Sequence, residues 1–549
     1  MIGSTLLLHL LLASIAGAVP ANERRSARPS CKRPETAVQS TAVTIPSSQA
    51  ATASSPPVVS SDPGPGPIVV TPFLPGSSGT GPAPPVASSP VASSPIAPSS
   101  VASSPVAPSS VAPSSVISSA VPSAPSSVSP PRTSGTGGVS PPVASPGAPP
   151  SGYRNVLYFT NWCVEPFKDQ WTVLRGVYGA NYQPADIPAD KVTHLLYSFA
   201  DIAADGEVIS SDPWSDTQRQ YPGDSSQAGN AYGCVKQLYA LKKQNRQLKL
   251  ILSIGGWTWS PKFVPVAATD AGRQRFATSA IKLMHDWGFD GIDIDWEYPS
   301  NAQEAANFVA LLKTCREELD KHAAQYAPGY HFALTIACPA GPTHYQNMDL
   351  RGMDPYVDAW HLMAYDYAGS WDTTTGHQAN LFPDPSNPEA TKFSTEAALA
   401  YYLGQGIRSD KIVLGLPLYG RSFLNTDGIG KPYQGIGQGS IEPGVWHYKV
   451  LPRAGAVEVF DQTAGALYSY DSSSRELVTY DNVQSANFKA DYLLNKKLGG
   501  AVFWEAAGDR KGEGSLVGAL ASKMGTLDPT QNLLNYPNSQ YANIKNNLA

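Results

Sequence analysis

Short apolar segments and longer stretches with helical periodicity alternate along residues 156–504. The apolar segments are 156–159, 192–199, 248–254, 291–297, 332–336, 359–363, 412–416 and 501–504. Segments of this length predict buried strands, and strands that alternate with helices predict a parallel sheet. Eight such units predict a (β/α)8 TIM barrel, which we expect to span residues 152–527.

Segment 270–287 illustrates the helical pattern between two of these strands. Asp270 is placed to cap the N-terminus of the helix. Apolar residues recur at helical spacing along it, namely Phe276, Ala280, Leu283 and Met284.

Residues 424–489 break the alternation of strands and helices. They begin Gly-rich and then contain three segments rich in β-branched and aromatic residues, at 457–460, 467–470 and 477–480. This pattern predicts a small α+β insertion between the seventh and eighth strands.

The composition changes at about residue 151. Residues 1–18 predict a secretory signal peptide; a membrane anchor is the alternative, but a spanning helix needs about 20 apolar residues. Residues 19–150 consist mainly of Ser, Pro, Ala, Val and Gly and lack the large apolar side chains of a core, so we expect a disordered stalk. Residues 528–549 are polar and are expected to form a C-terminal tail.

Charge and cysteine content limit the partners of the chain. A net charge of −5 without a basic cluster argues against nucleic acid. The cysteines, at positions 31, 163, 234, 315 and 338, have neither zinc-like nor disulfide-framework spacing, and a bridge between Cys163 and Cys234 is only a guess. We expect a secreted monomer, extracellular or associated with the cell wall, that has no contact with the membrane after signal cleavage.

The fourth apolar segment carries three acids, Asp293, Asp295 and Glu297, at alternate positions. Side chains two apart on a strand share a face, and successive acids lie about 6–7 Å apart at the backbone. Such acids cannot all ionise in a buried site, and barrel stability would favour Val, Ile or Leu there. The pattern therefore predicts a catalytic site with a shared proton and one acid kept protonated.

Glu297 is the acid nearest solvent, so we expect it to protonate a leaving oxygen, with a pKa raised by burial and by its neighbours. In sugar hydrolysis a second acid is commonly the nucleophile. The alternative is that an N-acetyl group of the substrate attacks its own anomeric carbon while Asp295 steadies the charged amide. The acids could instead bind a divalent metal, but the apolar residues between them are unlike a calcium loop, so we expect no metal.

The acid row Asp290-x-x-Asp293-x-Asp295-x-Glu297 resembles the motif of glycoside hydrolase family 18, the chitinases. Four further motifs are similar to those of the family: Ser253-Ile-Gly-Gly-Trp257, Met363-Ala-Tyr-Asp366, Tyr419-Gly-Arg421 and Phe503-Trp504-Glu505. The resemblance is to the fungal chitinases of bacterial type that carry an insertion domain. It implies hydrolysis of β-1,4-linked N-acetylglucosamine in chitin and chito-oligosaccharides with retention of configuration, without cofactor or metal.

The resemblance also implies roles for particular residues. Glu297 would be the proton donor, and Asp295 would turn toward it and hold the N-acetyl group. Asp293 would share a proton with Asp295, supported by Tyr158 and Ser253, while Tyr365 would position the acetamido carbonyl. Trp504 would form the apolar floor of the sugar site, lined by Met363 and Phe199. Neighbouring sugars would contact Gly256, Trp257, Tyr298, Asp366, Trp371, Tyr419 and Arg421, although Arg421 could merely neutralise an acid.

Three other functions remain open at this point. A carbohydrate-binding lectin on the same barrel would typically have lost the acid at position 297, which this chain retains. A structural wall protein would depend on the stalk. An endo-β-N-acetylglucosaminidase would share the acid row, but the insertion and the Met363-Ala-Tyr-Asp366 motif favour a chitinase. The long loop after the first strand leaves the choice between chain-end and internal cleavage undecided.

Overall fold

The computed structural model describes residues 152–164 and 181–548. The predicted signal peptide, the predicted stalk and most of the long loop after the first strand lie outside these residues. The C-terminal residue, Ala549, also lies outside them.

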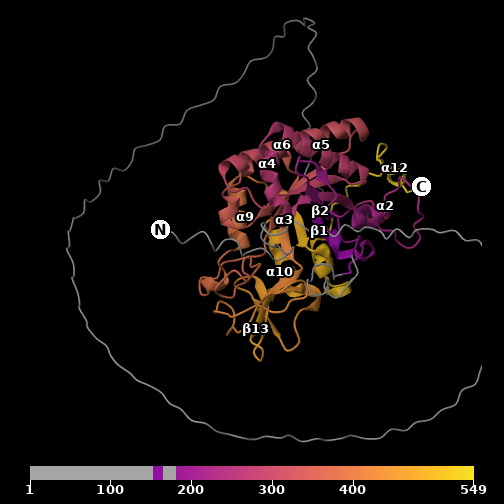
Figure 1. Cartoon of the computed structure of the whole chain (residues 1–549). Coiled ribbons are helices and arrows are strands. Elements are labelled where there is room, and N and C mark those ends of the chain that lie inside the picture. The colour runs from indigo at the N-terminus through magenta and orange to yellow at the C-terminus, as the bar shows by residue number, and fades with distance from the viewer. Residues whose placement is uncertain (1–151, 165–180, 549) are drawn as a thin grey trace, which may run out of the picture. The chain divides into compact units, whose positions relative to one another are not determined.

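Eight parallel strands form a closed barrel (Figure 1). They are β1 (Arg154–Thr160), β2 (His194–Ile202), β4 (Lys249–Gly255), β5 (Gly291–Asp295), β6 (Ala333–Pro339), β7 (Ala359–Met363), β8 (Ile412–Pro417) and β14 (Gly500–Trp504). Their order is β1-β14-β8-β7-β6-β5-β4-β2, and the pairing of β1 with β2 closes the ring. The predicted (β/α)8 TIM barrel is confirmed, and each apolar segment corresponds to one strand.

Helices follow the barrel strands along the chain. The longer ones are α2 (Gly233–Gln244), α5 (Asp270–Asp286), α6 (Ala302–Tyr326), α9 (Thr395–Gly404), α10 (Val483–Asn495) and α11 (Leu516–Met524). Shorter ones are α3 (Gly256–Trp259), α4 (Phe263–Ala267), α7 (Pro342–Tyr345), α8 (Leu350–Met353) and α12 (Ala542–Lys545). The N-cap of α5 is Thr269, whose side chain accepts a hydrogen bond from the Gly272 N–H, so the expectation that Asp270 is the cap was wrong by one residue.

The barrel strands bury both faces, because successive side chains point alternately into the barrel and toward the helices. The inward side chains form a small apolar cluster of Val156, Tyr158, Leu196, Phe199, Ile251, Ala359, Val413 and Val502. The outward side chains, such as Leu157 and Tyr197, belong to a larger core under the helices. A polar side chain on an inward position is therefore surrounded by apolar groups and needs a specific partner.

A second sheet is inserted in the chain between β8 and α10 and lies below the barrel in the view of Figure 1. Its antiparallel strands are β9 (Tyr419–Phe423), β10 (Val445–His447), β11 (Val457–Asp461), β12 (Ala466–Asp471) and β13 (Glu476–Tyr480). The sheet begins at Tyr419, before the expected position 424, because β9 follows β8 almost directly. It ends at Tyr480, and helix α10 begins at Val483, so residues 424–489 of the predicted α+β insertion include four of these strands and the start of that helix.

The end of the chain packs against the barrel at the N-terminal end of β5. Asp290, the first acid of the motif, is buried there, and its Oδ2 accepts hydrogen bonds from Lys242 Nζ at 2.7 Å and from the Leu250 N–H at 2.8 Å. Its Oδ1 accepts one from the Leu533 N–H at 2.9 Å. The hydroxyl of buried Tyr536 donates to the adjacent carbonyl, at position 289, also at 2.9 Å. Asp290 is thus an anchor for residues 528–548 at the end of the barrel opposite its mouth.

We expect Asp290→Ala to lower the free energy of unfolding by about 3–5 kcal/mol, because Lys242 would remain as a buried charge without its partner. The side chains of both residues are 0% exposed. Urea unfolding and the melting temperature measure the effect. Lys313→Ala is the matched control, since the Lys313–Glu317 pair is exposed on α6 and such pairs contribute about 1 kcal/mol or less. Equal stability of the two variants would contradict this anchoring role.

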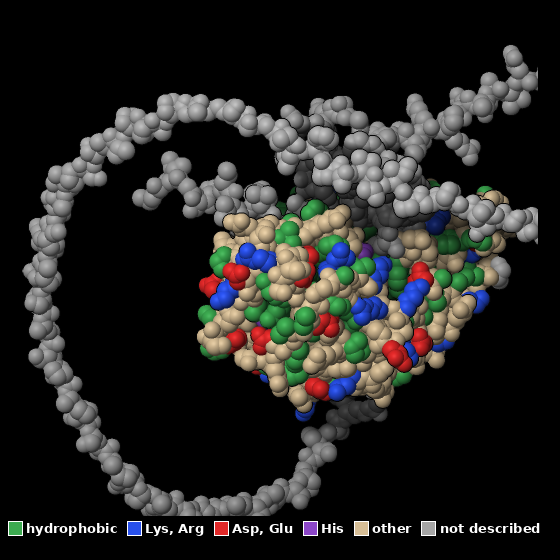
Figure 2. Space-filling view, turned by 90° about the horizontal axis from the view of Figure 1, so that it is seen from below, with side chains coloured by type: hydrophobic (Ala, Val, Ile, Leu, Met, Phe, Trp, Pro, Cys, Tyr) green, Lys and Arg blue, Asp and Glu red, His purple; other side chains and the backbone are tan. Residues whose placement is uncertain are grey.

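None of the helices among the described residues is both long and apolar enough to cross a membrane. On the face shown in Figure 2, acidic and basic side chains are interspersed.

Candidate active site

The acid row runs along β5 toward the C-terminal end of the barrel. Asp293 and Asp295 lie within β5 and are buried, whereas Glu297 follows the strand by two residues and is half-buried. Asp293 is in register with Ser253 on β4 and with Thr335 on β6. The barrel therefore places three polar side chains side by side on neighbouring strands.

Asp293 is surrounded by hydrogen-bond donors. Its Oδ2 accepts bonds from Ser253 Oγ at 2.7 Å and Tyr158 OH at 3.2 Å, and its Oδ1 accepts one from Thr335 Oγ1 at 2.6 Å. His361 Nδ1 lies 3.3 Å from Oδ1. Burial would raise the pKa of Asp293, but the imidazole of His361 and the hydroxyls of Thr335 and Ser253 outweigh it and hold the pKa below its usual range.

Thr335 and His361 were not identified from the sequence, whereas Tyr158 and Ser253 were expected beside Asp293. Thr335 is a single polar residue within the apolar strand β6, and His361 is a single polar residue within the apolar strand β7. That contrast was the available signal, because a polar side chain on an inward position of a barrel strand requires a buried partner.

Asp295 has the opposite environment. Its Oδ1 is buried and has no hydrogen-bond partner among the described residues. Burial raises the pKa of Asp295 well above its usual value, and the charges of Glu297 and Asp293 raise it further. Two acids of one strand thus differ in charge: Asp293 favours the ionised form and Asp295 the protonated form.

Glu297 is held at the barrel mouth. Its backbone N–H donates to Ser260 Oγ at 2.7 Å, and its Oε2 accepts a hydrogen bond from Tyr298 OH at 3.1 Å. Burial raises the pKa of Glu297 to about 7, the Tyr298 hydroxyl opposes this shift, and the charge of Asp366 adds to it. Glu297 can therefore be protonated near neutral pH, as a general acid must be.

Asp366 joins the end of β7 to the second sheet. Its Oδ1 accepts hydrogen bonds from Tyr419 OH at 2.5 Å and from Arg421 Nε at 2.6 Å. The guanidinium carbon of Arg421 lies 4.7 Å from the centre of the Trp371 ring. Arg421 therefore does neutralise an acid, and the same contacts hold Trp371 beside it.

Tyr365 lies next to Asp366 in sequence and is half-buried. Burial raises the pKa of its hydroxyl well above 10, and the negative charges of Asp295, Asp366 and Glu297 raise it further. The hydroxyl is therefore a neutral hydrogen-bond donor that lies in the electrostatic field of the acid row.

Aromatic rings surround the inner end of the site. The Trp504 ring lies 5.1 Å from that of Tyr158 and stacks on that of Phe199 at 5.6 Å. Trp162, which was not identified from the sequence, also stacks on Phe199, at 6.2 Å. Met363, the last residue of β7, is half-buried. Such rings present flat apolar faces that suit the C–H groups of a sugar.

The Gly-Gly-Trp segment after β4 borders this cluster. Gly256 has φ +72°, and a Cβ there would come 2.8 Å from the Phe199 ring, so its position depends on the absence of a side chain. Trp257 is 40% exposed, and its backbone is close enough to Glu297 to oppose the rise in the pKa of that acid. The structure thus brings Gly256 to the aromatic cluster and Trp257 to the acid at the mouth.

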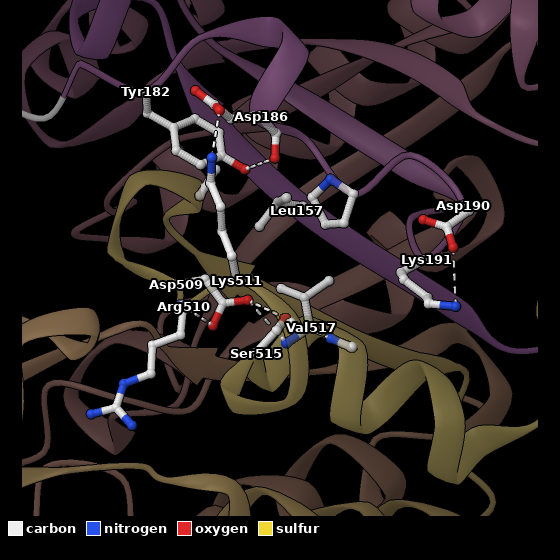
Figure 3. Close-up of a pocket in the computed structure, with 14 residues that line it drawn as sticks. Leu157, Tyr182, Asp186, Asp190, Lys191, Asp509, Arg510, Lys511, Ser515 and Val517 are labelled. Atoms are coloured by element: carbon white, nitrogen blue, oxygen red, sulfur yellow. Dashed lines mark hydrogen bonds and ion pairs between the residues drawn. The ribbon is translucent and has the colours of Figure 1, made fainter.

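Other features of the described residues lie apart from the acids. A cavity of about 310 Å³ on the outer side of β1 is lined by residues such as Leu157, Asp509 and Val517 and includes no residue of the acid row (Figure 3). The described residues contain no group of three or more His, Cys, Asp or Glu side chains arranged to hold a metal ion. Cys234 is a buried free thiol, so the guess of a bridge between Cys163 and Cys234 was wrong.

A closed parallel barrel with an acid row that leads to its mouth, bordered by stacked aromatic rings, defines a glycoside hydrolase. The chain belongs to the glycosyl hydrolases family 18, whose family model matches residues 154–509.

Three relatives illustrate this membership. Chitinase 1 of Aphanocladium album is 52% identical over 400 residues, which cover 72% of this chain and 92% of that protein. A solved chitinase from Bacillus thuringiensis has a TM-score of 0.63 and 30% identity, and covers 70% of this chain and 71% of its own. Human YKL-39, described as a pseudo-chitinase with retained chitooligosaccharide binding, has a TM-score of 0.58 and 27% identity, and covers 68% of this chain and 100% of its own.

Proposed function

We propose that the protein is a chitinase that cleaves β-1,4-linked N-acetylglucosamine by a retaining, substrate-assisted mechanism. The observation that carries this proposal is the contrast between the two buried acids of β5. Asp293 is enclosed by polar side chains from four other strands and is not free to attack a sugar, whereas Asp295 has a buried oxygen without a partner among the described residues. Asp295 is kept protonated by its raised pKa and is a poor nucleophile, so the acetamido oxygen of the substrate supplies the nucleophile.

The steps follow from the positions of the acids. Glu297, protonated near neutral pH, gives its proton to the glycosidic oxygen as the bond to the anomeric carbon breaks. The acetamido oxygen bonds to that carbon, and the positive charge that develops on the amide is stabilised by Asp295 and by the Tyr365 hydroxyl. Ionised Glu297 then takes a proton from water as the water oxygen bonds to the anomeric carbon; the bond to the acetamido oxygen breaks, which opens the ring intermediate and restores the configuration.

The remaining side chains bind the sugar chain. Trp504, stacked on Phe199, forms the floor under the distorted sugar, and Met363 and Tyr158 complete its apolar lining. Trp257, Tyr298, Asp366, Trp371, Tyr419 and Arg421 contact neighbouring sugars, and Gly256 leaves room for the Phe199 ring. Ordered aromatic rings add little entropic cost when a sugar binds to them.

The alternative function is sugar binding without turnover, since the pseudo-chitinase YKL-39 retains chitooligosaccharide binding on the same fold. The retained Glu297 and its raised pKa favour an enzyme. Incubation with soluble N-acetylglucosamine oligomers, followed by product and anomer analysis, decides between the two. Release of β-anomers supports the proposal, whereas binding without any product supports a lectin. A parallel incubation with glycoprotein glycans tests the third function: cleavage confined to these glycans would support an endo-β-N-acetylglucosaminidase.

A thiazoline mimic of the ring intermediate is expected to inhibit the enzyme competitively and to bind about 10²-fold or more tightly than the substrate, because the mimic reproduces the bond made by the acetamido oxygen. Inhibition constants with a chito-oligosaccharide substrate measure this effect. Free N-acetylglucosamine is the control, since it has the same amide but no fused ring. Equal, weak inhibition by both compounds would exclude the substrate-assisted route.

The predicted signal peptide and the Ser/Pro-rich region support a secreted enzyme that works outside the cell or in the wall. In this proposal residues 19–150 are a stalk, chitin and chito-oligosaccharides are the partners, and the protein acts as a monomer.

A further inference from the structure

One buried group in the barrel is not used by the proposed mechanism. His361 lies in the middle of β7, between Ala359 and Met363, and is 2% exposed. Because Ala359 belongs to the inward apolar cluster, His361 at the alternate position faces the barrel interior as well. An imidazole buried there requires an explanation, since apolar side chains fill most inward positions.

The strands beside β7 give His361 no partner. In register with it are Ala337 on β6 and Val413 on β8, both of which are apolar. The imidazole instead reaches past β6 to β5, where its Nδ1 lies 3.3 Å from Asp293 Oδ1. This is the only ion pair that either residue makes in the described part of the chain.

The contact is electrostatic rather than a formed hydrogen bond. Nδ1 of His361 is buried and has no hydrogen-bond partner within the described residues, although Asp293 Oδ1 is at ion-pair distance. The hydroxyls of Thr335, Ser253 and Tyr158 already bond the same carboxylate but cannot supply a positive charge. His361 is therefore the group that can balance the charge of Asp293.

We propose that His361 is a positioning residue that keeps Asp293 ionised, so that the proton of the acid row stays on Asp295 and Glu297 during turnover. The inference rests on the proposed function. When Asp295 turns toward the substrate, its proton leaves the neighbourhood of Asp293. The negative charge of Asp293 is then isolated in an apolar barrel, where a cation at 3.3 Å stabilises it more than it would in water.

The other titratable groups around His361 are few. His194 on β2 interacts with it electrostatically, and Lys249 and Arg154 act in turn on His194. Of the charged groups named here, Asp293 is the one that carries a negative charge, and it is the one at ion-pair distance from the imidazole.

The test is the pH dependence of kcat/KM for His361→Asn and His361→Gln on a soluble chito-oligosaccharide. Loss of the imidazole raises the pKa of Asp293, so the acid limb of the profile should move to higher pH by about one unit or more. We expect kcat to fall and KM to change by less than about twofold, since His361 does not touch the sugar. His285→Asn is the matched control, because this buried imidazole pairs with His322 at 2.9 Å between helices α5 and α6, outside the barrel strands.

A double variant tests the route of the effect. If His361 acts through the charge of Asp293, then His361→Asn should cause little further loss of kcat in an Asp293→Asn background. Folded variants with an unchanged acid limb, or full additivity of the two losses, would overturn the proposal. If both His361 variants fail to fold, nuclear magnetic resonance of the imidazole in the intact enzyme replaces them. A neutral His361 throughout the active pH range would then exclude the role.

Failure of this inference can be told apart from failure of the proposed function. A Glu297→Gln variant with full activity would remove the proposed function itself. An inactive Glu297→Gln variant together with an unshifted acid limb in the His361 variants would remove only the role of His361.

Discussion

Glu297→Gln is expected to lower kcat on chito-oligosaccharides by about 10²–10⁴-fold, with substrate binding largely preserved. The amide has nearly the same shape as the carboxylic acid and can still accept the Tyr298 hydroxyl bond, but it cannot donate the acidic proton to the leaving oxygen. Initial rates and the dissociation constant of a chito-oligosaccharide measure the two effects separately.

The same residue predicts the alkaline limb of the pH profile. Activity requires protonated Glu297, whose pKa is raised to about 7, so kcat/KM should fall as the pH rises through about 7.

The control for Glu297→Gln is Glu317→Gln on the exposed face of α6, which should retain wild-type rates. Wild-type activity of Glu297→Gln itself would show that another group donates the proton.

Asp295→Asn is expected to lower kcat by about 10²–10³-fold, the typical loss when one group that stabilises a developing charge is removed. The asparagine keeps the size of the side chain, but it has no acidic proton to share with Glu297 and cannot become negatively charged beside the developing oxazolinium ring. Because the amide still occupies the buried position, the effect should fall on kcat more than on KM. Steady-state kinetics and thiazoline binding measure both parts.

A variant of a buried acid elsewhere in the chain is the control that distinguishes an effect on catalysis from an effect on folding. Asp481 is 1% exposed and pairs with Lys489 at 2.6 Å between β13 and α10. Asp481→Asn should lower the melting temperature without changing kcat per folded molecule. If Asp295→Asn behaves in the same way, its role is structural and the substrate-assisted mechanism is incorrect.

Much of the fold follows from local sequence patterns. Each barrel strand lies within a few residues of an apolar segment, because a strand buried on both faces needs a continuous apolar run. The first strand of the inserted sheet was not identified, because only Leu418 separates β9 from the end of β8. The packing of the chain end was missed entirely. Tyr536 and Leu533 lie in a polar segment, and only their partners on distant elements explain how they are held.

The residues of the candidate site also fall into two groups: those that local sequence predicts and those that only the fold brings together. Asp293, Asp295 and Glu297 are close in sequence, so strand geometry alone places them in one row. Thr335 and His361 are far from them along the chain; the pairing of β5 with β6 brings Thr335 to Asp293, and the folded barrel brings His361 there from β7. No periodicity within one strand could indicate that contact.

The sequence by itself determined the barrel and the acid row, because both depend on spacing along single strands. The tertiary structure decided which acid is ionised. Four strands supply polar partners to Asp293 and none of the described residues supplies one to Asp295 Oδ1, so the pKa values of two identical buried side chains shift in opposite directions. A pKa depends on the groups that surround an acid in space, and in a closed barrel those groups come from across the whole chain.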